Sequence, residues 1–155
     1  MKIFVKKIIS GLLLIVCIGC VSVKVPKYLK EQSPYTKTFY ATFDDTFSAV
    51  QKSLKDLGWR VSQTANPSVF EQDKTAASPS AKQVLIFTEV RQTPLILSSR
   101  YMNLNIYVRS ADDNTTDVEI RYISVVPMFF KNMKNYKNDE VINKLLDHIS
   151  KYLAK

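Results

Sequence analysis

Glycine, cysteine and histidine are scarce in this sequence. Its 155 residues include three glycines, two cysteines and one histidine, His148. A phosphate-binding loop needs several glycines, because only glycine lets successive backbone amides wrap closely around an anion. A zinc site needs three or four cysteine, histidine or carboxylate ligands in register. Neither kind of site is recognisable in the sequence, and we expect no metal ion and no cofactor.

Apolar residues, by contrast, are plentiful. The chain is 46% hydrophobic and 23% charged, with a formal net charge of +8. This balance is typical of a globular core rather than of a disordered segment. The length suits one domain and is short for two.

The first twenty residues have the order of an export signal. Lys2, Lys6 and Lys7 make the start basic, an apolar run covers residues 8–18, and Gly19 and Cys20 follow it. The run is about half of the roughly 20 residues that a membrane-spanning helix needs. This order predicts a cleaved signal peptide. The alternative is an uncleaved signal anchor.

The end of this segment, Val16-Cys17-Ile18-Gly19-Cys20, resembles the lipobox of bacterial lipoprotein precursors. Gly19 and Cys20 match its last two positions, whereas Cys17 stands where leucine is usual. The resemblance implies cleavage after residue 19, so that 1–19 is the signal peptide. It also implies that Cys20 carries fatty acids, such as palmitate, on its thiol and its new amino group. Val21 follows, where an aspartate would favour the inner membrane, so the resemblance favours the periplasmic face of the outer membrane.

Processing at this position would change the chain. Removing residues 1–19 leaves 136 of the 155 residues and lowers the formal net charge from +8 to +5. No cysteine remains for a disulfide, so the domain depends on its apolar core. Each buried acyl methylene contributes about 0.8 kcal/mol, and stable anchoring needs at least two acyl chains. The anchored cysteine would carry three.

Residues 20–35 are expected to form a lipidated tether ahead of the domain. Pro26 and Pro34 interrupt regular structure there. The lysines of this stretch could attract anionic lipid, at about 1 kcal/mol for each cation. The alternative is a solvated leash. The folded domain is then expected over 36–155.

The hydrophobic pattern of residues 36–155 predicts an α+β domain. Alternation indicates strands, and spacings of three and four residues indicate helices. In chain order we expect a strand at 38–43, a helix from about 44 to 57 ended by Gly58, strands at 59–63, 83–91, 100–109 and 117–126, and a helix from about 139 to 153. Asp44 and Asp45 are expected to cap the first helix.

These elements fit a two-layer sandwich. A mostly antiparallel sheet of four or five strands would carry both helices on one face, in the order β-α-β-β-β-β-α. Residues 110–116 read as a hairpin turn between two of the strands. The arrangement is loosely similar to small domains of envelope lipoproteins, such as the C subunit of the outer-membrane β-barrel assembly machine. That resemblance implies an accessory interaction role and assigns no site residues.

The other face of the sheet is a candidate docking surface. Alternation places Tyr101, Asn103, Tyr107, Arg109 and Arg121 on the face expected to meet solvent. Tyrosine and arginine are enriched at protein interfaces, because they combine contact area with polar tips. The alternative is an ordinary solvated sheet face.

A second candidate is the apolar and basic stretch at 125–137. It is expected to be a loop that dips into a membrane surface or grips an apolar partner. Alternatively, Phe129 and Phe130 close the end of the core. The residues proposed for this contact are Met128, Phe129, Phe130, Lys131, Met133 and Lys134.

The catalytic candidates have simpler interpretations. His148 falls at the edge of a helix's apolar stripe, where a half-buried structural histidine is expected. The acidic pairs at 44–45, 112–113 and 139–140 fall where helix starts and turns need acceptors. Paired carboxylates could serve sugar hydrolysis in an envelope enzyme, but we expect no enzyme. A basic, aromatic sheet could also bind RNA, but an exported domain would not meet nucleic acid.

The sequence therefore predicts a membrane-anchored cell-envelope lipoprotein that docks an envelope protein partner without catalysis. The alternative is a carrier for a lipid or another amphiphile. In that case residues 95–97 and the 125–137 stretch would form the mouth of a cleft.

Overall fold

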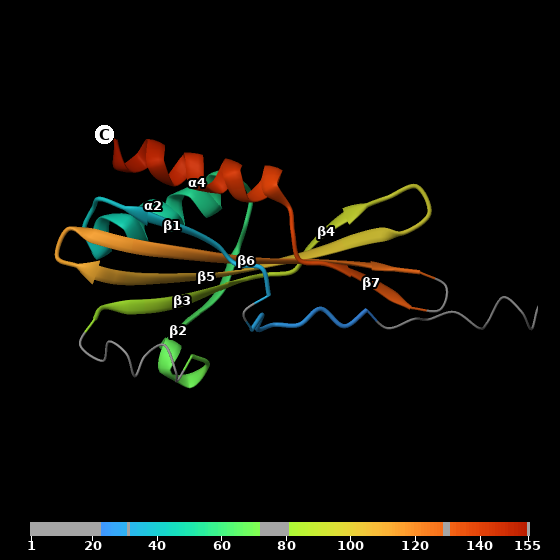
Figure 1. Cartoon of the computed structure of the whole chain (residues 1–155). Coiled ribbons are helices and arrows are strands. Elements are labelled where there is room, and N and C mark those ends of the chain that lie inside the picture. The colour runs from blue at the N-terminus through green and yellow to red at the C-terminus, as the bar shows by residue number, and fades with distance from the viewer. Residues whose placement is uncertain (1–22, 31, 72–80, 129–130, 155) are drawn as a thin grey trace, which may run out of the picture.

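The computed structural model describes residues 23–30, 32–71, 81–128 and 131–154. They form an α+β fold in which an open antiparallel sheet of seven strands carries two helices on one face (Figure 1). The predicted fold class and the order of elements are confirmed. The sheet has more strands than the four or five expected, because two short strands extend it.

The strands and helices have the following bounds. In chain order they are β1 (Tyr35–Phe39), α2 (Phe43–Asp56), β2 (Val61–Ala65), the short 3-10 helix η1 (Pro67–Val69), β3 (Gln83–Thr88), β4 (Arg91–Pro94), β5 (Ser99–Asp112), β6 (Thr115–Pro127), β7 (Asn132–Asn135) and α4 (Asp139–Leu153). The helix η1 lies in the connection that follows β2. The additional strands are β4 and β7.

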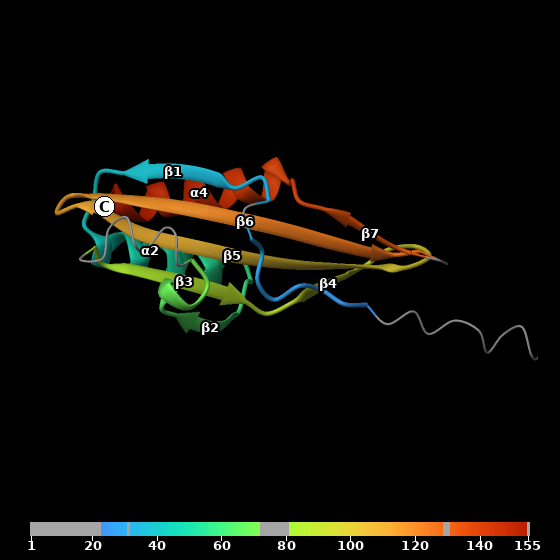
Figure 2. The ribbon, with the colours of Figure 1, turned by 60° about the horizontal axis from the view of Figure 1, so that its bottom comes forward.

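The long hairpin of β5 and β6 is the axis of the sheet. The strand order is β1-β6-β5-β3-β2, while β4 pairs with the beginning of β5 and β7 pairs with the end of β6. One end of the sheet therefore contains β4, the beginning of β5, the end of β6, β7 and the β4–β5 turn. We call it the hairpin end. It projects beyond both helices (Figures 1 and 2).

Local chemistry sets both ends of α2. The side chain of Thr42, rather than Asp44 or Asp45, caps the helix by accepting a hydrogen bond from the Asp45 backbone amide at 3.2 Å. The two aspartates lie in the first turn instead, where negative charge is favourable. The helix ends as predicted before Gly58, whose φ of +72° is a conformation that glycine adopts easily.

The main core lies between the sheet and the helices. α4 has the predicted bounds and buries Ile142, Leu145 and Ile149. The sheet contributes alternate residues of its long hairpin, namely Met102, Leu104, Ile106, Val108, Val118, Ile120 and Tyr122. The predicted inward face of β5 and β6 is thus confirmed.

Candidate functional site: the covered sheet face and the hairpin end

The sheet face opposite the helices is covered by the N-terminal segment 23–30. This segment runs along β5 and β6 on the side away from α2 and α4 (Figures 1 and 2). Residues predicted to face solvent there are buried instead: Asn103, Tyr107 and Arg121 are 2%, 4% and 1% exposed. Tyr101 and Arg109 are half-buried. The prediction of an exposed docking surface on this face is therefore wrong.

Two asparagines of β5 bind the backbone of the segment. The Asn105 side chain accepts a hydrogen bond from the Leu29 amide at 2.7 Å and donates one to the Lys27 carbonyl at 3.0 Å. The Asn103 side chain donates to the Pro26 carbonyl at 3.0 Å. Backbone groups of 26–29 lose their contact with water when the segment packs on the sheet. The two asparagine side chains replace those lost hydrogen bonds.

The side chains of the segment alternate between the sheet and solvent. Val23, Val25 and Leu29 pack in a small apolar cluster against β5, β6 and the residues before α4, and its other members are Tyr101, Ile123, Val125 and Tyr136. The intervening lysines, Lys24, Lys27 and Lys30, are exposed. The expected tether over 20–35 is thus wrong for residues 23–30, because apolar packing and hydrogen bonds hold them to the sheet.

Arg121 lies at the centre of a buried charge network under the segment. Its guanidinium is paired with Glu71, which is 5% exposed, and with Glu119 at 2.6 Å. It also donates a hydrogen bond to the Leu29 carbonyl at 2.7 Å. Burial alone would lower the pKa of Arg121, but the hydrogen bond and charge of the two carboxylates raise it. The guanidinium therefore stays charged. It links β6 to Glu71 through the ion pair and to the N-terminal segment through the Leu29 carbonyl.

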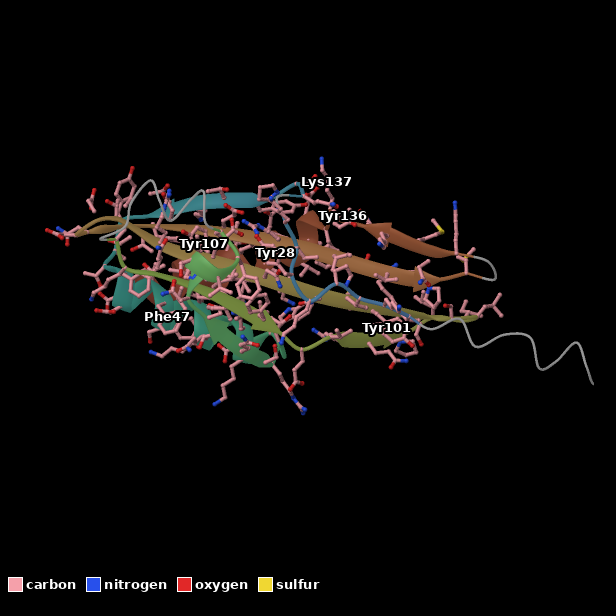
Figure 3. All side chains as sticks on the ribbon, turned by 90° about the horizontal axis from the view of Figure 1, so that it is seen from below. Tyr28, Phe47, Tyr101, Tyr107, Tyr136 and Lys137 are labelled. Atoms are coloured by element: carbon pink, nitrogen blue, oxygen red, sulfur yellow. The ribbon has the colours of Figure 1, made fainter. Side chains whose placement is uncertain are left out.

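Tyr28, in the N-terminal segment, also takes part in this network. Its hydroxyl donates to Glu71 at 2.6 Å, and its ring packs 5.1 Å from that of Phe70. Burial, followed by the hydrogen bond to Glu71, raises the pKa of Tyr28 to about 12. The hydroxyl thus remains a donor at physiological pH. Figure 3 shows Tyr28 and Tyr107 over the middle of this face, with Tyr101 nearer the hairpin end.

The contacts of the bound segment set the direction in which it runs along β5. Leu29 lies beside Asn105, Pro26 beside Asn103, and Val23 and Val25 in the cluster with Tyr101. Going backwards along the segment therefore leads towards the hairpin end. Cys20, the predicted lipidation site, precedes Val23 by three residues and lies outside the described residues.

The predicted loop over 125–137 is mostly a β-hairpin. Its first residues belong to β6, and 132–135 form β7, because the backbone of these polar residues pairs with β6. Met128 and Met133 are 48% and 54% exposed. Lys131 and Lys134 are exposed as well. Phe129 and Phe130 lie outside the described residues.

The turn between β4 and β5 carries further exposed apolar side chains. Leu95, Ile96 and Leu97 are 39%, 101% and 96% exposed. A hydrogen bond of 2.9 Å from the Leu95 amide to the Ser98 carbonyl closes the turn. Sequence reasoning noticed this apolar run but not that it forms the tip of a hairpin.

A cleft of about 360 Å³ lies where α2 and α4 approach β4. Its apolar lining includes Trp59 and Met102, and charged side chains such as Arg91 and Lys144 also line it. The guanidinium of Arg91 lies 5.5 Å from the centre of the Trp59 ring. Residues 95–97, expected at the mouth of a carrier cleft, are not among the residues that line it.

The acidic pairs lie at helix starts and in a turn, as the sequence predicts, although Asp44 and Asp45 do not cap α2. Asp112 accepts a hydrogen bond from the Asn114 amide in the β5–β6 turn, and Asp139 accepts one from the Tyr35 hydroxyl at 2.6 Å. Hydrogen bonds from Thr115 and then from the Asn114 amide lower the pKa of Asp112. His148 is half-buried in α4, as expected. Within the described ranges, no group of three or more histidine, cysteine or acidic residues is placed to hold a metal ion.

Among the described residues, no helix is both long enough and apolar enough to cross a bilayer. Comparison of the sequence with protein-family models and with curated proteins finds no match.

Proposed function

We propose that this chain is a cell-envelope lipoprotein, anchored by fatty acids on Cys20, whose folded domain stands on the membrane surface and docks an envelope protein. The observation that supports this proposal best is the fixed path of residues 23–30. The lipobox-like sequence ends at residue 20, and the chain is already bound to the sheet at Val23. The expected anchor and the folded domain therefore adjoin each other.

The short connection limits how far the domain can stand from the bilayer. An extended chain spans at most about 3.6 Å per residue. Three residues from Cys20 to Val23 thus reach about 10 Å. A domain held this closely presents one end to the lipid and its remaining surfaces to the periplasm.

Confinement to a surface supports a docking role. It raises the effective concentration of any partner in the same membrane, so modest contacts suffice. The outer faces of α2 and α4 and the cleft beside Trp59 remain accessible in the described structure, whereas the face once expected to dock is covered. We place the partner contact on the side of the helices.

Metabolic labelling with an alkyne analogue of palmitate tests the anchor. The wild-type protein should take up the label, and Cys20→Ala should not. Cys17→Leu is the matched control, because it removes the other cysteine and brings the segment closer to the usual lipobox; it should stay labelled. Labelling of the Cys20→Ala protein, or none of the wild type, would refute the anchor.

Crosslinking in intact cells tests the docking role. A photoreactive residue at Lys144, beside the cleft, should capture one defined envelope protein, while one at Asp113 in the β5–β6 turn should not. Charge reversal of the neighbouring Arg91 should reduce the capture. Equal capture at both positions, or at neither, would remove the support for a docking surface on the helix side.

The carrier function is the second candidate, and the cleft beside Trp59 favours it. Its volume lies near the lower end of the range for small-molecule pockets. Solvent extraction and mass spectrometry of the purified protein distinguish the two functions. A stoichiometric amphiphile that is lost in Trp59→Ala supports a carrier, and an empty protein supports docking.

A further inference from the structure

We propose that the hairpin end inserts its apolar tip, centred on Ile96 and Leu97, into the headgroup region of a phospholipid bilayer. The inference rests on the proposed lipid anchor for the orientation of the domain. It goes further in assigning a second membrane contact, made by the fold itself.

The first argument is exposure. Ile96 and Leu97 are 101% and 96% exposed, among the most exposed large apolar side chains of the described residues. Met128 and Met133 add exposed apolar surface on the neighbouring hairpin. Several exposed apolar side chains on neighbouring hairpins are typical of a surface that contacts a membrane or an apolar partner.

The second argument is that the two hairpins adjoin each other in the sheet. The four strands β4, β5, β6 and β7 are successive neighbours in the sheet. The Ser98 hydroxyl, at the β4–β5 turn, donates a hydrogen bond of 3.0 Å to the Pro127 carbonyl at the end of β6. The exposed apolar side chains at 96–97 and those of Met128 and Met133 are thus carried by adjoining hairpins of one sheet.

The third argument is the charge of the strands that carry the tips. Neither residues 90–111 nor residues 120–138 include an aspartate or a glutamate. Both stretches contribute exposed cations, Arg100 on β5 and Lys131 and Lys134 on the neighbouring hairpin. At the opposite end of the same long hairpin, the turn holds Asp112 and Asp113. An apolar tip with cations behind it suits an anionic bilayer surface.

The fourth argument is the direction of the anchor, which selects a bilayer over a protein or a second copy of this chain. Val23 lies in the cluster with Tyr101 and Val125, residues that belong to the base of the hairpin end. The exposed Lys24 lies on the same stretch of chain. A lipid on Cys20 would therefore bring the bilayer to the tips, whereas any other occupant would have to displace that bilayer.

A site-specific fluorophore measures the insertion. The purified acylated protein is labelled at Ile96→Cys, or at Asp113→Cys as the control at the opposite end, and reconstituted into vesicles of phosphatidylcholine and phosphatidylglycerol. We expect brominated lipid to quench the label at 96, and aqueous iodide to quench the label at 113. Equal quenching of both labels by iodide would overturn the proposal.

Vesicle binding without the acyl chains tests the tip independently of the anchor. The mature chain 20–155 carrying Cys20→Ser should bind these vesicles, and Ile96→Asn with Leu97→Asn should weaken binding by about tenfold or more. Added salt should weaken it as well, because the cations are exposed. Both substituted side chains lie in solvent, so the circular dichroism spectrum should not change.

Tyr40→Ser is the matched control for this experiment. Tyr40 is 92% exposed and follows β1, at the end of the sheet where Phe39 pairs with Thr116. Its loss should leave vesicle binding unchanged. Absence of binding by the native tips, or equal losses in the tip and control variants, would refute membrane insertion. A chain that binds through its tips but is never acylated would instead refute only the proposed anchor.

Discussion

Arg121 of β6 and Glu71, fifty residues apart in the chain, form an ion pair whose side chains are 1% and 3% exposed. The pair lies beneath Tyr28 and Leu29, so the N-terminal segment seals it from water. The domain thus uses its first described residues as part of the sheet's covering layer. The anchor proposed at Cys20 would therefore act on the whole fold through these bound residues.

Replacing Arg121 tests whether this pair holds the segment. Arg121→Met removes the cation that pairs with the buried Glu71 and the partly buried Glu119, so it should lower the free energy of unfolding by about 3–5 kcal/mol. Arg109→Met is the control, because the ion pair of Arg109 with Asp117 is partly exposed and should contribute about 1 kcal/mol or less. Urea unfolding measures both. Equal, small losses would contradict a central role for Arg121.

The Tyr28 hydroxyl predicts a specific pH dependence. Its pKa rises from 10.0 to about 12 on folding. The stability that it contributes is therefore fully present below pH 10 and disappears as the pH rises towards 12. Tyr28→Phe should be less stable than wild type by about 1–3 kcal/mol at pH 9. This difference should shrink at higher pH, and a gap that stays constant would show that the hydroxyl does not titrate as described.

Asn105 should control the attachment of the N-terminal segment. Asn105→Leu removes the partners of the Leu29 amide and the Lys27 carbonyl, at a cost of about 1–3 kcal/mol for each buried group left unpaired. Trypsin should then cut faster after the exposed lysines of 24–30. Asn143→Leu, the same change on the exposed side of α4, should leave the rate unaltered. Similar cleavage of both variants would contradict the attachment.

Gly58 tests the end of α2. A Cβ at this position would meet no atom within 4 Å, so any cost of a substitution comes from the backbone φ of +72°. Gly58→Ala should destabilise the domain by about 1–2 kcal/mol. Gly58→Asn should cost less, because asparagine tolerates this conformation better. Thermal unfolding of the wild type and the two variants gives the order of their stabilities. An alanine variant as stable as the wild type would contradict the predicted backbone cost.

The sequence predicted those elements whose side chains follow a clear period. α4 was predicted at its observed bounds, since its apolar residues recur at helical spacing over its full length. The alternation of β5 and β6 likewise assigned the inward face correctly. By contrast, β4 and β7 consist mainly of exposed polar residues and are held by backbone pairing, which leaves no periodic signal.

The covered face could not be predicted by alternation alone. Asn103, Asn105 and Arg121 are polar and therefore read as exposed, but each is buried against backbone groups of the segment. A partial signal was present, since Ile123 and Val125 are apolar on the same face and Val23, Val25 and Leu29 alternate with lysines. What the sequence lacked was any indication that these two apolar sets meet.

The mass of the mature protein is the most direct test of the anchor on which the proposed function depends. Intact-mass analysis of material extracted from its native membrane should show a chain that begins at Cys20 and carries fatty acids on that residue. Tandem fragmentation should place the added mass on the first residue. A mature chain of residues 20–155 without acyl groups, or a chain that retains residues 1–19, would contradict the account.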